Sequence, residues 1–418
     1  MPLILLNLPF LILVWVPIIT NKNEIEFINS ELLHISNKIE LTSNYSLFGG
    51  LTGIAIFYYY YFKLTGNYQY KDQANTIILN CLKSINEIEN DFSFSNGYTG
   101  ICYTLLALRK NGFINFEPKI IFKEIDNNVS IETLRNMQIN IYDFLYGGIG
   151  GGLYFLERLP EPLAKKTLSK IIDLLYIHAK ITNDTICWND NFALNSKENE
   201  YTEQYNLGLA HGVPSIIYFL SILYKNNIDK NKCYYLLNGS INWLLKQKLQ
   251  YPTLSLFPHS LPLDKYSSES RLGWCYGDLG IGTSLYIAGC HTLNQYWKNI
   301  AIEILIHSSK RYNLELNSVN DACLCHGTSG IALMYNRIYQ KTKIEQFKIA
   351  SLFWYNQTIQ KGININKYNG YKTMYRIDNK NKWLNSNNLI HGISGIGLSL
   401  ISAISTIEPK WDRCLLIS

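Results

Sequence analysis

The sequence has no extended run of lysine or arginine. Only 17% of its 418 residues are charged, and the net charge of +6 is spread thinly along the chain. Phosphate backbones are bound by clustered cations, so nucleic acid is not expected as a partner. Disorder is not expected either, because 47% of the residues are hydrophobic and can bury a large core.

The sequence also lacks the cysteine pattern of a disulfide framework. Its nine cysteines are odd in number and scattered through a long chain. Small secreted domains instead carry dense, paired cysteines. We therefore expect reduced thiols and a cytoplasmic location.

The first 21 residues contain no charged side chain. Their length suits a membrane or signal segment, but Lys and Arg are missing from their start, no small-residue cleavage site follows, and Pro9 and Pro17 interrupt any helix. Two interpretations stay open. Residues 1–21 give the protein a membrane association, or they form an apolar extension ahead of a main domain at residues 22–418.

A repeated glycine motif organises the rest of the chain. A Gly-x-x-small step followed by an apolar stretch recurs seven times, at intervals of 47 to 65 residues. The steps begin at Gly50, Gly97, Gly148, Gly212, Gly277, Gly327 and Gly392. The apolar stretches are typical of buried helices, and amphipathic segments such as residues 165–180 and 299–310 alternate with them. The pattern predicts an all-α fold, an α/α toroid of seven helix pairs, with small non-helical insertions at residues 185–205 and 250–270.

Cysteine and histidine gather just before these glycines. Cys275 and Cys325 stand two residues before a step, and His211, His326 and His391 stand one residue before. Equivalent positions in a toroid converge at one end, beside helix N-termini that favour thiolates. Two cysteines and one histidine suit Zn²⁺ and leave its fourth position open. The predicted ligands are Cys275, Cys325 and His326, with Cys323 as the competing sulfur.

Three short segments then point to a family. Residues 274–277 (WCYG), 325–327 (CHG) and 209–212 (LAHG) resemble the signature of the lanthionine synthetase C-like family, and the resemblance covers nearly all of the chain after about residue 22. It implies an α/α toroid with one catalytic zinc on Cys275, Cys325 and His326. It also implies catalytic roles for four further residues: His211 as acid/base, Asp143, Arg271 and Tyr276.

The activity implied by this resemblance is that of a zinc-dependent lanthipeptide cyclase. Such an enzyme adds cysteine thiols of a dehydrated precursor peptide to dehydroalanine or dehydrobutyrine, and so forms the thioether rings of a lanthipeptide antibiotic or bacteriocin. A lanthipeptide dehydratase is the expected partner, and an exporter a further one. The alternative is a non-catalytic adaptor of the same fold that binds a peptide or glutathione. The role of His391 is open between structural and substrate-facing.

Overall fold

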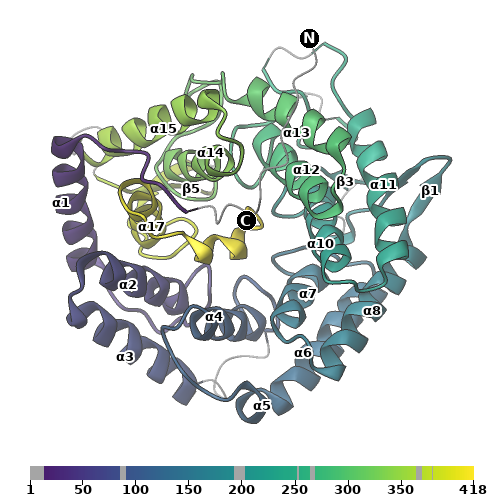
Figure 1. The fold of residues 1–418 in the computed structure, drawn as a ribbon, viewed down its shortest axis with the longest axis horizontal. Coiled ribbons are helices and arrows are strands. Elements are labelled where there is room, and N and C mark those ends of the chain that lie inside the picture. Colours follow the sequence, from purple (N-terminus) through teal and green to yellow (C-terminus); the bar gives the residue numbers. More distant parts are fainter. Residues whose placement is uncertain are drawn as a thin grey trace.

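Helices dominate the structure, a computed structural model that describes residues 14–84, 91–192, 203–251, 254–263, 269–363, 370–378 and 380–418. Within these residues seven inner helices alternate along the chain with seven outer helices, and Figure 1 looks down the axis of the resulting double ring. The all-α toroid expected from the sequence is thereby confirmed.

The inner ring consists of α2 (Leu51–Thr65), α4 (Tyr98–Lys110), α7 (Gly148–Glu157), α10 (Val213–Lys225), α12 (Asp278–Thr292), α14 (Thr328–Thr342) and α17 (Ile393–Ile404). The outer ring consists of α1 (Lys22–Lys38), α3 (Tyr68–Ser84), α6 (Lys123–Gln138), α8 (Pro162–His178), α11 (Lys230–Lys246), α13 (Gln295–Ser308) and α15 (Glu345–Ile363), and the short α5 (Pro118–Ile121) precedes α6. The predicted amphipathic segments at 165–180 and 299–310 correspond to α8 and α13.

Burial distinguishes the helices of the two rings. In α10 every residue from Val213 to Leu223 is buried, as expected for a helix that is apolar on all sides. The outer helix α8 instead buries one stripe, which includes Leu168, Ile171, Ile172 and Leu175, and exposes its other face. Outer helices therefore cover the inner ring with one side only.

Glycine caps the N-terminus of each inner helix. The N-cap residues are Gly50, Gly97, Gly147, Gly212, Gly277, Gly327 and Gly392. Six of them are the predicted first glycines of the repeats. In the third repeat the structure places Gly147, and not Gly148, at this position, because Gly148 is already the first residue of α7.

Close approach, more than unusual backbone angles, explains these glycines. Only Gly277 has a positive φ, of 103°, whereas the other six caps have φ between −99° and −135°. A Cβ on Gly97 would overlap the carbonyl oxygen of Asp91. A Cβ on Gly280 would lie 2.9 Å from the Cβ of Leu209 in the preceding repeat. Glycine thus lets neighbouring helix starts touch.

A chain of backbone hydrogen bonds links the loops that precede the inner helices. Each bond joins the residue two positions before one N-cap glycine to its equivalent in the next repeat. The bonds run from N–H to C=O in the order Ala210, Cys275, Cys325, Ile390, Phe48, Ser95 and Leu145. The seventh repeat is thereby joined to the first, and Cys275 and Cys325 are direct neighbours in this chain of bonds.

The axis of the ring is filled by side chains and by the end of the chain. Phe48, Phe144 and Trp274 pack edge to face, with ring centroids 6.1 to 6.5 Å apart. Trp274 Nε1 donates a hydrogen bond of 2.6 Å to the carbonyl oxygen of Leu415, in the 3₁₀ helix Lys410–Leu415. The C-terminus accordingly lies in the middle of the ring in Figure 1. Among the described residues, aromatic side chains and the C-terminal segment thus pack together at the axis of the ring.

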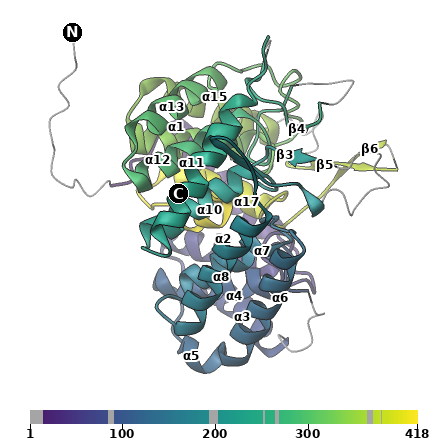
Figure 2. The ribbon, with the colours of Figure 1, turned by 90° about the vertical axis from the view of Figure 1, so that its right-hand side faces the viewer.

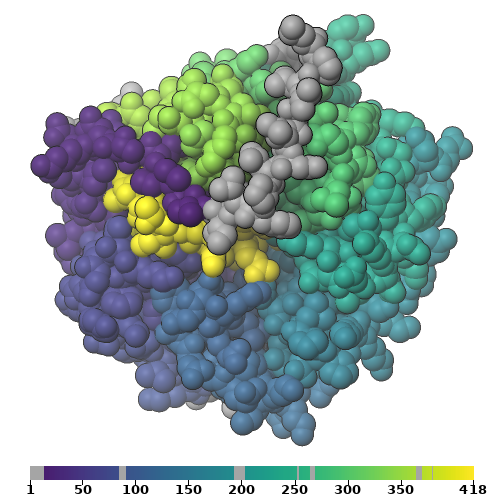
Figure 3. Space-filling view, viewed as in Figure 1, coloured from purple at the N-terminus to yellow at the C-terminus, as the bar shows by residue number. Residues whose placement is uncertain are grey.

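Residues 14–21 also belong to this packed body, although the sequence grouped them with the apolar extension. Trp15, Ile18 and Ile19 are buried, and Trp15 Nε1 donates a hydrogen bond of 2.8 Å to the carbonyl oxygen of Ser402. Figure 3 shows this segment (purple) beside C-terminal residues (yellow). Residues 1–13 lie outside the described residues. None of the helices described is both long and apolar enough to span a bilayer.

Replacing Trp15 with alanine is expected to lower the free energy of unfolding by about 3 kcal/mol, because a large buried aromatic side chain is lost. Chemical denaturation monitored by circular dichroism measures this change. Val16→Ala is the matched control, since Val16 is 50% exposed and its truncation should change stability by less than about 0.5 kcal/mol. Equal, small effects of both substitutions would show that the segment is not part of the core.

In the described part of the chain, three short antiparallel strand pairs interrupt the helices: β1 (Lys180–Thr182) with β2 (Thr185–Cys187), β3 (Tyr205–Asn206) with β4 (Ser260–Leu261), and β5 (Thr373–Ile377) with β6 (Lys380–Leu384). The first two pairs fall in or beside the predicted non-helical insertions. The β5–β6 hairpin was not anticipated, and Figure 2 shows it projecting from the body of the toroid.

Candidate active site

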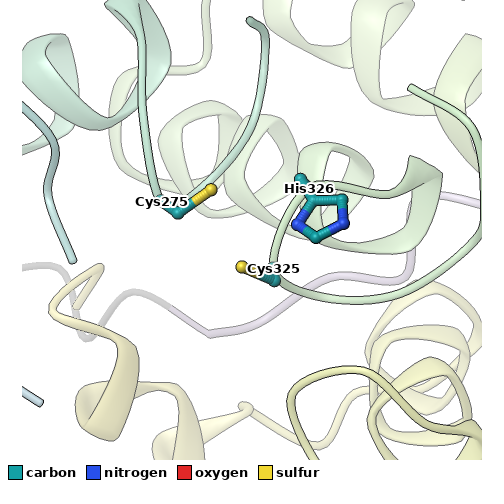
Figure 4. A group of neighbouring side chains, drawn as sticks. All are labelled: Cys275, Cys325 and His326. Atoms are coloured by element: carbon teal, nitrogen blue, oxygen red, sulfur yellow. The ribbon is translucent and has the colours of Figure 1, made fainter. Parts of the chain in front are cut away.

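Two cysteines and a histidine meet where two inner helices begin. The sulfur atoms of Cys275 and Cys325 and a ring nitrogen of His326 all lie within 4.8 Å of one another. Cys275 comes from the loop before α12, and the other two come from the loop before α14. The sulfurs point toward each other in Figure 4, with the imidazole beside them. The convergence expected from the repeat positions is present in the fold.

The chemistry of this group fits a zinc ion. The hydrogen bond from Cys325 holds the pKa of the Cys275 thiol well below its ordinary value, against the effect of burial, and His326 and Arg271 act in the same direction. The same bond and burial raise the pKa of Cys325. A cation bound between the two sulfurs would take the place of the hydrogen bond that joins them. Thiolate sulfur and imidazole nitrogen are the donors that zinc prefers.

Cys323 occupies a different position. It forms a second group with Asp321 and His326, whose ligand atoms also lie within 4.8 Å of one another. Its backbone N–H donates to Asp321 Oδ1 at 3.0 Å, and burial raises the pKa of its thiol well above the ordinary value. Within the part of the chain that the structure describes, the metal-ligand group that contains Cys275 has Cys325 as its second sulfur.

His211 and Asp143 form a side-chain pair that bridges the third and fourth repeats. His211 Nδ1 lies 2.6 Å from Asp143 Oδ2. Asp143 is buried, and its Oδ1 accepts hydrogen bonds from the backbone N–H groups of Leu145 (2.7 Å) and Tyr146 (2.8 Å). The carboxylate is thus fixed by its own loop and presents its second oxygen to the imidazole.

The charge of Asp143 controls the proton on His211. Burial lowers the pKa of His211, but the hydrogen bond and negative charge of Asp143 outweigh it, so that the net pKa lies above the ordinary 6.5. Cys275 also raises the pKa of His211, so Cys275 lies within electrostatic reach of the imidazole. The His211 side chain is still 23% exposed. It can therefore hold a proton near neutral pH and exchange it with a bound molecule.

Two tyrosines pack against the His211 ring. The centroids of Tyr146 and Tyr276 each lie 6.2 Å from it, at interplanar angles of 13° and 32°. Asn206 Nδ2 donates to the Tyr276 hydroxyl oxygen at 3.2 Å, and burial raises the pKa of Tyr276 to about 12. Tyr276 is therefore neutral at physiological pH and lines the space beside His211.

Arg271 and His391 lie near the group formed by Cys275, Cys325 and His326. The positive charge of Arg271 acts on both Cys275 and Cys325. The His391 ring lies 5.7 Å from that of His326, and burial together with His326 lowers the pKa of His391 to about 4. His391 is thus a neutral imidazole next to a predicted ligand.

Sequence reasoning missed Tyr146, and the reason is the one-residue shift in the third repeat. Counted from Gly147, Tyr146 stands one residue before the glycine, as His211, Tyr276 and His326 do.

A second signal, which was not recognised in the sequence, lies six residues before the glycine. Four repeats carry Asn or Asp at this position, and each side chain accepts a hydrogen bond from the backbone N–H of the residue two positions later in the chain. These residues are Asn44, Asp91, Asn206 and Asp321.

Comparisons with known proteins agree with this fold. The family model described as lanthionine synthetase C-like protein matches residues 42–416. The structure of a nisin cyclase superimposes with a TM-score of 0.71 at 19% identity, covering 95% of this chain and 98% of that chain. A family 105 glycoside hydrolase of C. acetobutylicum ATCC 824 reaches a TM-score of only 0.40 at 11% identity, over 93% of this chain and 99% of that chain, and supports no conclusion. No curated protein matches the sequence significantly.

The match to the family model spans nearly the whole described toroid and includes Asp143, His211, Cys275, Cys325 and His326. The chain therefore belongs to the lanthionine synthetase C-like family.

Proposed function

We propose that this protein is a lanthipeptide cyclase that holds one zinc ion on Cys275, Cys325 and His326. The observation that carries the proposal is the meeting of two distinct groups at one end of the toroid. One is a Cys/Cys/His set with zinc-binding chemistry, and the other is a histidine held by a buried carboxylate. The substrate is a dehydrated precursor peptide, whose cysteine thiols add to dehydroalanine and dehydrobutyrine.

The reaction adds S–H across a carbon–carbon double bond. Sulfur joins the β-carbon, negative charge develops toward the carbonyl group, and the α-carbon must receive a proton. Bound zinc would supply the positive charge that lowers the pKa of the incoming thiol. Arg271, whose charge reaches both cysteines of the set, stabilises the negative charge that develops on the substrate.

His211 delivers the proton to the α-carbon, and the proton released by the substrate thiol restores it. Asp143 occupies Nδ1, which leaves Nε2 as the atom that gives the proton. Asp143 keeps the imidazole protonated and correctly turned, and Tyr146 and Tyr276 pack against the ring. Tyr276 lines the substrate side of the site as a neutral phenol.

The proposal also implies partners and a location. A dehydratase must generate the alkene before this protein acts, and an exporter would remove the finished peptide. The nine cysteines, all within the described residues, are free, as suits the reducing cytoplasm.

A synthetic peptide with one dehydroalanine and one cysteine tests the activity. The zinc-loaded protein is expected to convert it to a product of unchanged mass that no longer reacts with N-ethylmaleimide, as followed by mass spectrometry. Protein stripped of metal with a chelator is the control and should leave the thiol free at the uncatalysed rate. An adaptor would bind the peptide or glutathione without speeding ring formation, and that result would overturn the proposal.

A further inference from the structure

The β5–β6 hairpin is anchored directly beside the candidate active site. Met374 N–H donates to Asp321 Oδ2 at 3.1 Å, and the Thr373 hydroxyl donates to the carbonyl oxygen of His391. The ring of Tyr375 meets the ring of His391 edge to face, with centroids 5.8 Å apart. His391 in turn contacts His326. The base of the hairpin is therefore part of the wall of the site.

One face of the hairpin carries lysines outward from this wall. Side chains alternate between the two faces of a strand, and directly paired residues share a face. Tyr375 is paired with Lys382, and Ile377 is paired with Lys380. The face that reaches His391 through Tyr375 thus continues to Lys382 and Lys380, and both lysines are exposed.

The hairpin as a whole is cationic in a chain whose charge is otherwise thinly spread. Residues 372–384 contain four cations and a single acid, Asp378. Lys382 and Asp378 approach each other to 3.9 Å, but both side chains are exposed, so that this pair neutralises little of the charge. The same stretch exposes Ile377 and Leu384. Positive charge and apolar surface therefore alternate along an arm that begins at the active site.

We propose that the β5–β6 hairpin is a docking arm for an acidic, extended segment of the peptide substrate, an inference that rests on the proposed cyclase function. Its two strands form a two-stranded sheet, and each is therefore an edge to which an extended peptide can add. Lys380, Lys382 and Arg376 attract acidic side chains, and Ile377 and Leu384 accept apolar ones. A docked segment keeps the cysteines of a flexible peptide at high effective concentration near one centre.

Charge reversal on the arm tests the proposal in the full-length protein. The probe is a fluorescein-labelled synthetic peptide of twelve residues in which Asp alternates with Val and Thr, and binding is followed by fluorescence anisotropy at low salt. The double substitution Lys380→Glu and Lys382→Glu is expected to weaken binding about tenfold or more. The matched control is Lys165→Glu with Lys166→Glu, two exposed lysines of α8, which should bind the probe as the wild type does.

Each result has a definite meaning. Unchanged affinity of the hairpin variant, or equal weakening in the α8 control, overturns the docking arm. Equal binding of a labelled single-stranded DNA of the same charge also overturns it, since the arm would then be a general anion site. Ring formation in the short neutral test peptide is measured separately with the wild type. If the wild type forms no rings while the difference in anisotropy persists, the docking arm stands and the cyclase function fails.

Discussion

Replacing either Cys275 or Cys325 with alanine is expected to reduce the zinc content of the purified protein from about one ion per chain to a small fraction. Three protein ligands are the minimum for a stable catalytic zinc site, and each substitution leaves two. Loss of a residue that only supports a metal ligand typically lowers activity ~10- to 100-fold. Activity should fall by more here, because the ligand itself is removed. Metal analysis by mass spectrometry and the cyclisation assay measure the two effects.

Cys323→Ala is the matched control for this experiment. Cys323 is two residues from Cys325 and belongs to the neighbouring group with Asp321 and His326, so that it tests which sulfur holds the metal. It should keep its zinc. The helical circular dichroism of all three variants should stay that of the wild type, because the hydrogen bonds that join these loops are made by backbone atoms. Full zinc in both Cys275→Ala and Cys325→Ala, or its loss in Cys323→Ala alone, would contradict the assignment.

The substitution His211→Ala is expected to leave zinc in place while slowing ring formation on the order of 10²- to 10⁴-fold, the usual effect of removing an acid/base group. His211 comes from a repeat in which Ala210 stands at the position of Cys325, and its Nδ1 is bonded to Asp143. Uncatalysed addition still forms some thioether, so α-carbon stereochemistry should be measured with the rate. Loss of zinc would make His211 a ligand, and wild-type kinetics would make it structural.

Two further variants sharpen the result. Asp143→Asn keeps an oxygen acceptor for the backbone N–H groups but removes the charge that raises the pKa of His211. Burial is then opposed only by the lesser effects of Cys275 and Asp190, and the pKa falls. An activity that needs protonated His211 is present below this pKa, so the alkaline limit of the pH profile should move to lower pH. His34→Ala, an exposed histidine of α1, should leave rate and profile unchanged.

The double ring and the ligand group were predictable because one steric requirement recurs. Each inner helix begins at a glycine whose Cβ would collide with the loop just before it, and in several repeats a second glycine, such as Gly280, lets the helix start approach the loop of a neighbouring repeat. The spacing of Cys and His from the first glycine fixes where they meet. The start of the third repeat was placed one residue too late, because Gly147 and Gly148 both fit the motif. An error of one residue moved Tyr146 out of phase with His211 and Tyr276 and hid it.

Other parts depend on contacts that local sequence does not encode. Residues 14–19 are as apolar as a membrane segment. Only the burial of Trp15, Ile18 and Ile19 and the hydrogen bond from Trp15 to Ser402 distinguish a segment of the core from an anchor. The β5–β6 hairpin reads as a polar insertion. Its position is set by hydrogen bonds to Asp321 and to the carbonyl oxygen of His391. Asp321 is distant in sequence, so the local pattern does not reveal this contact.

The joining of the last repeat to the first has a consequence for how such a protein can evolve. Open repeat arrays end in specialised capping units and gain or lose whole units with little damage. Here Ile390 of the last repeat bonds to Phe48 of the first, so that no unit is terminal. Deleting one unit would leave two unmatched faces, and adding one would force the circle to widen. Gain or loss of a whole unit is therefore expected to break the ring, whereas substitutions, and insertions between units at positions such as that of the hairpin, leave it closed.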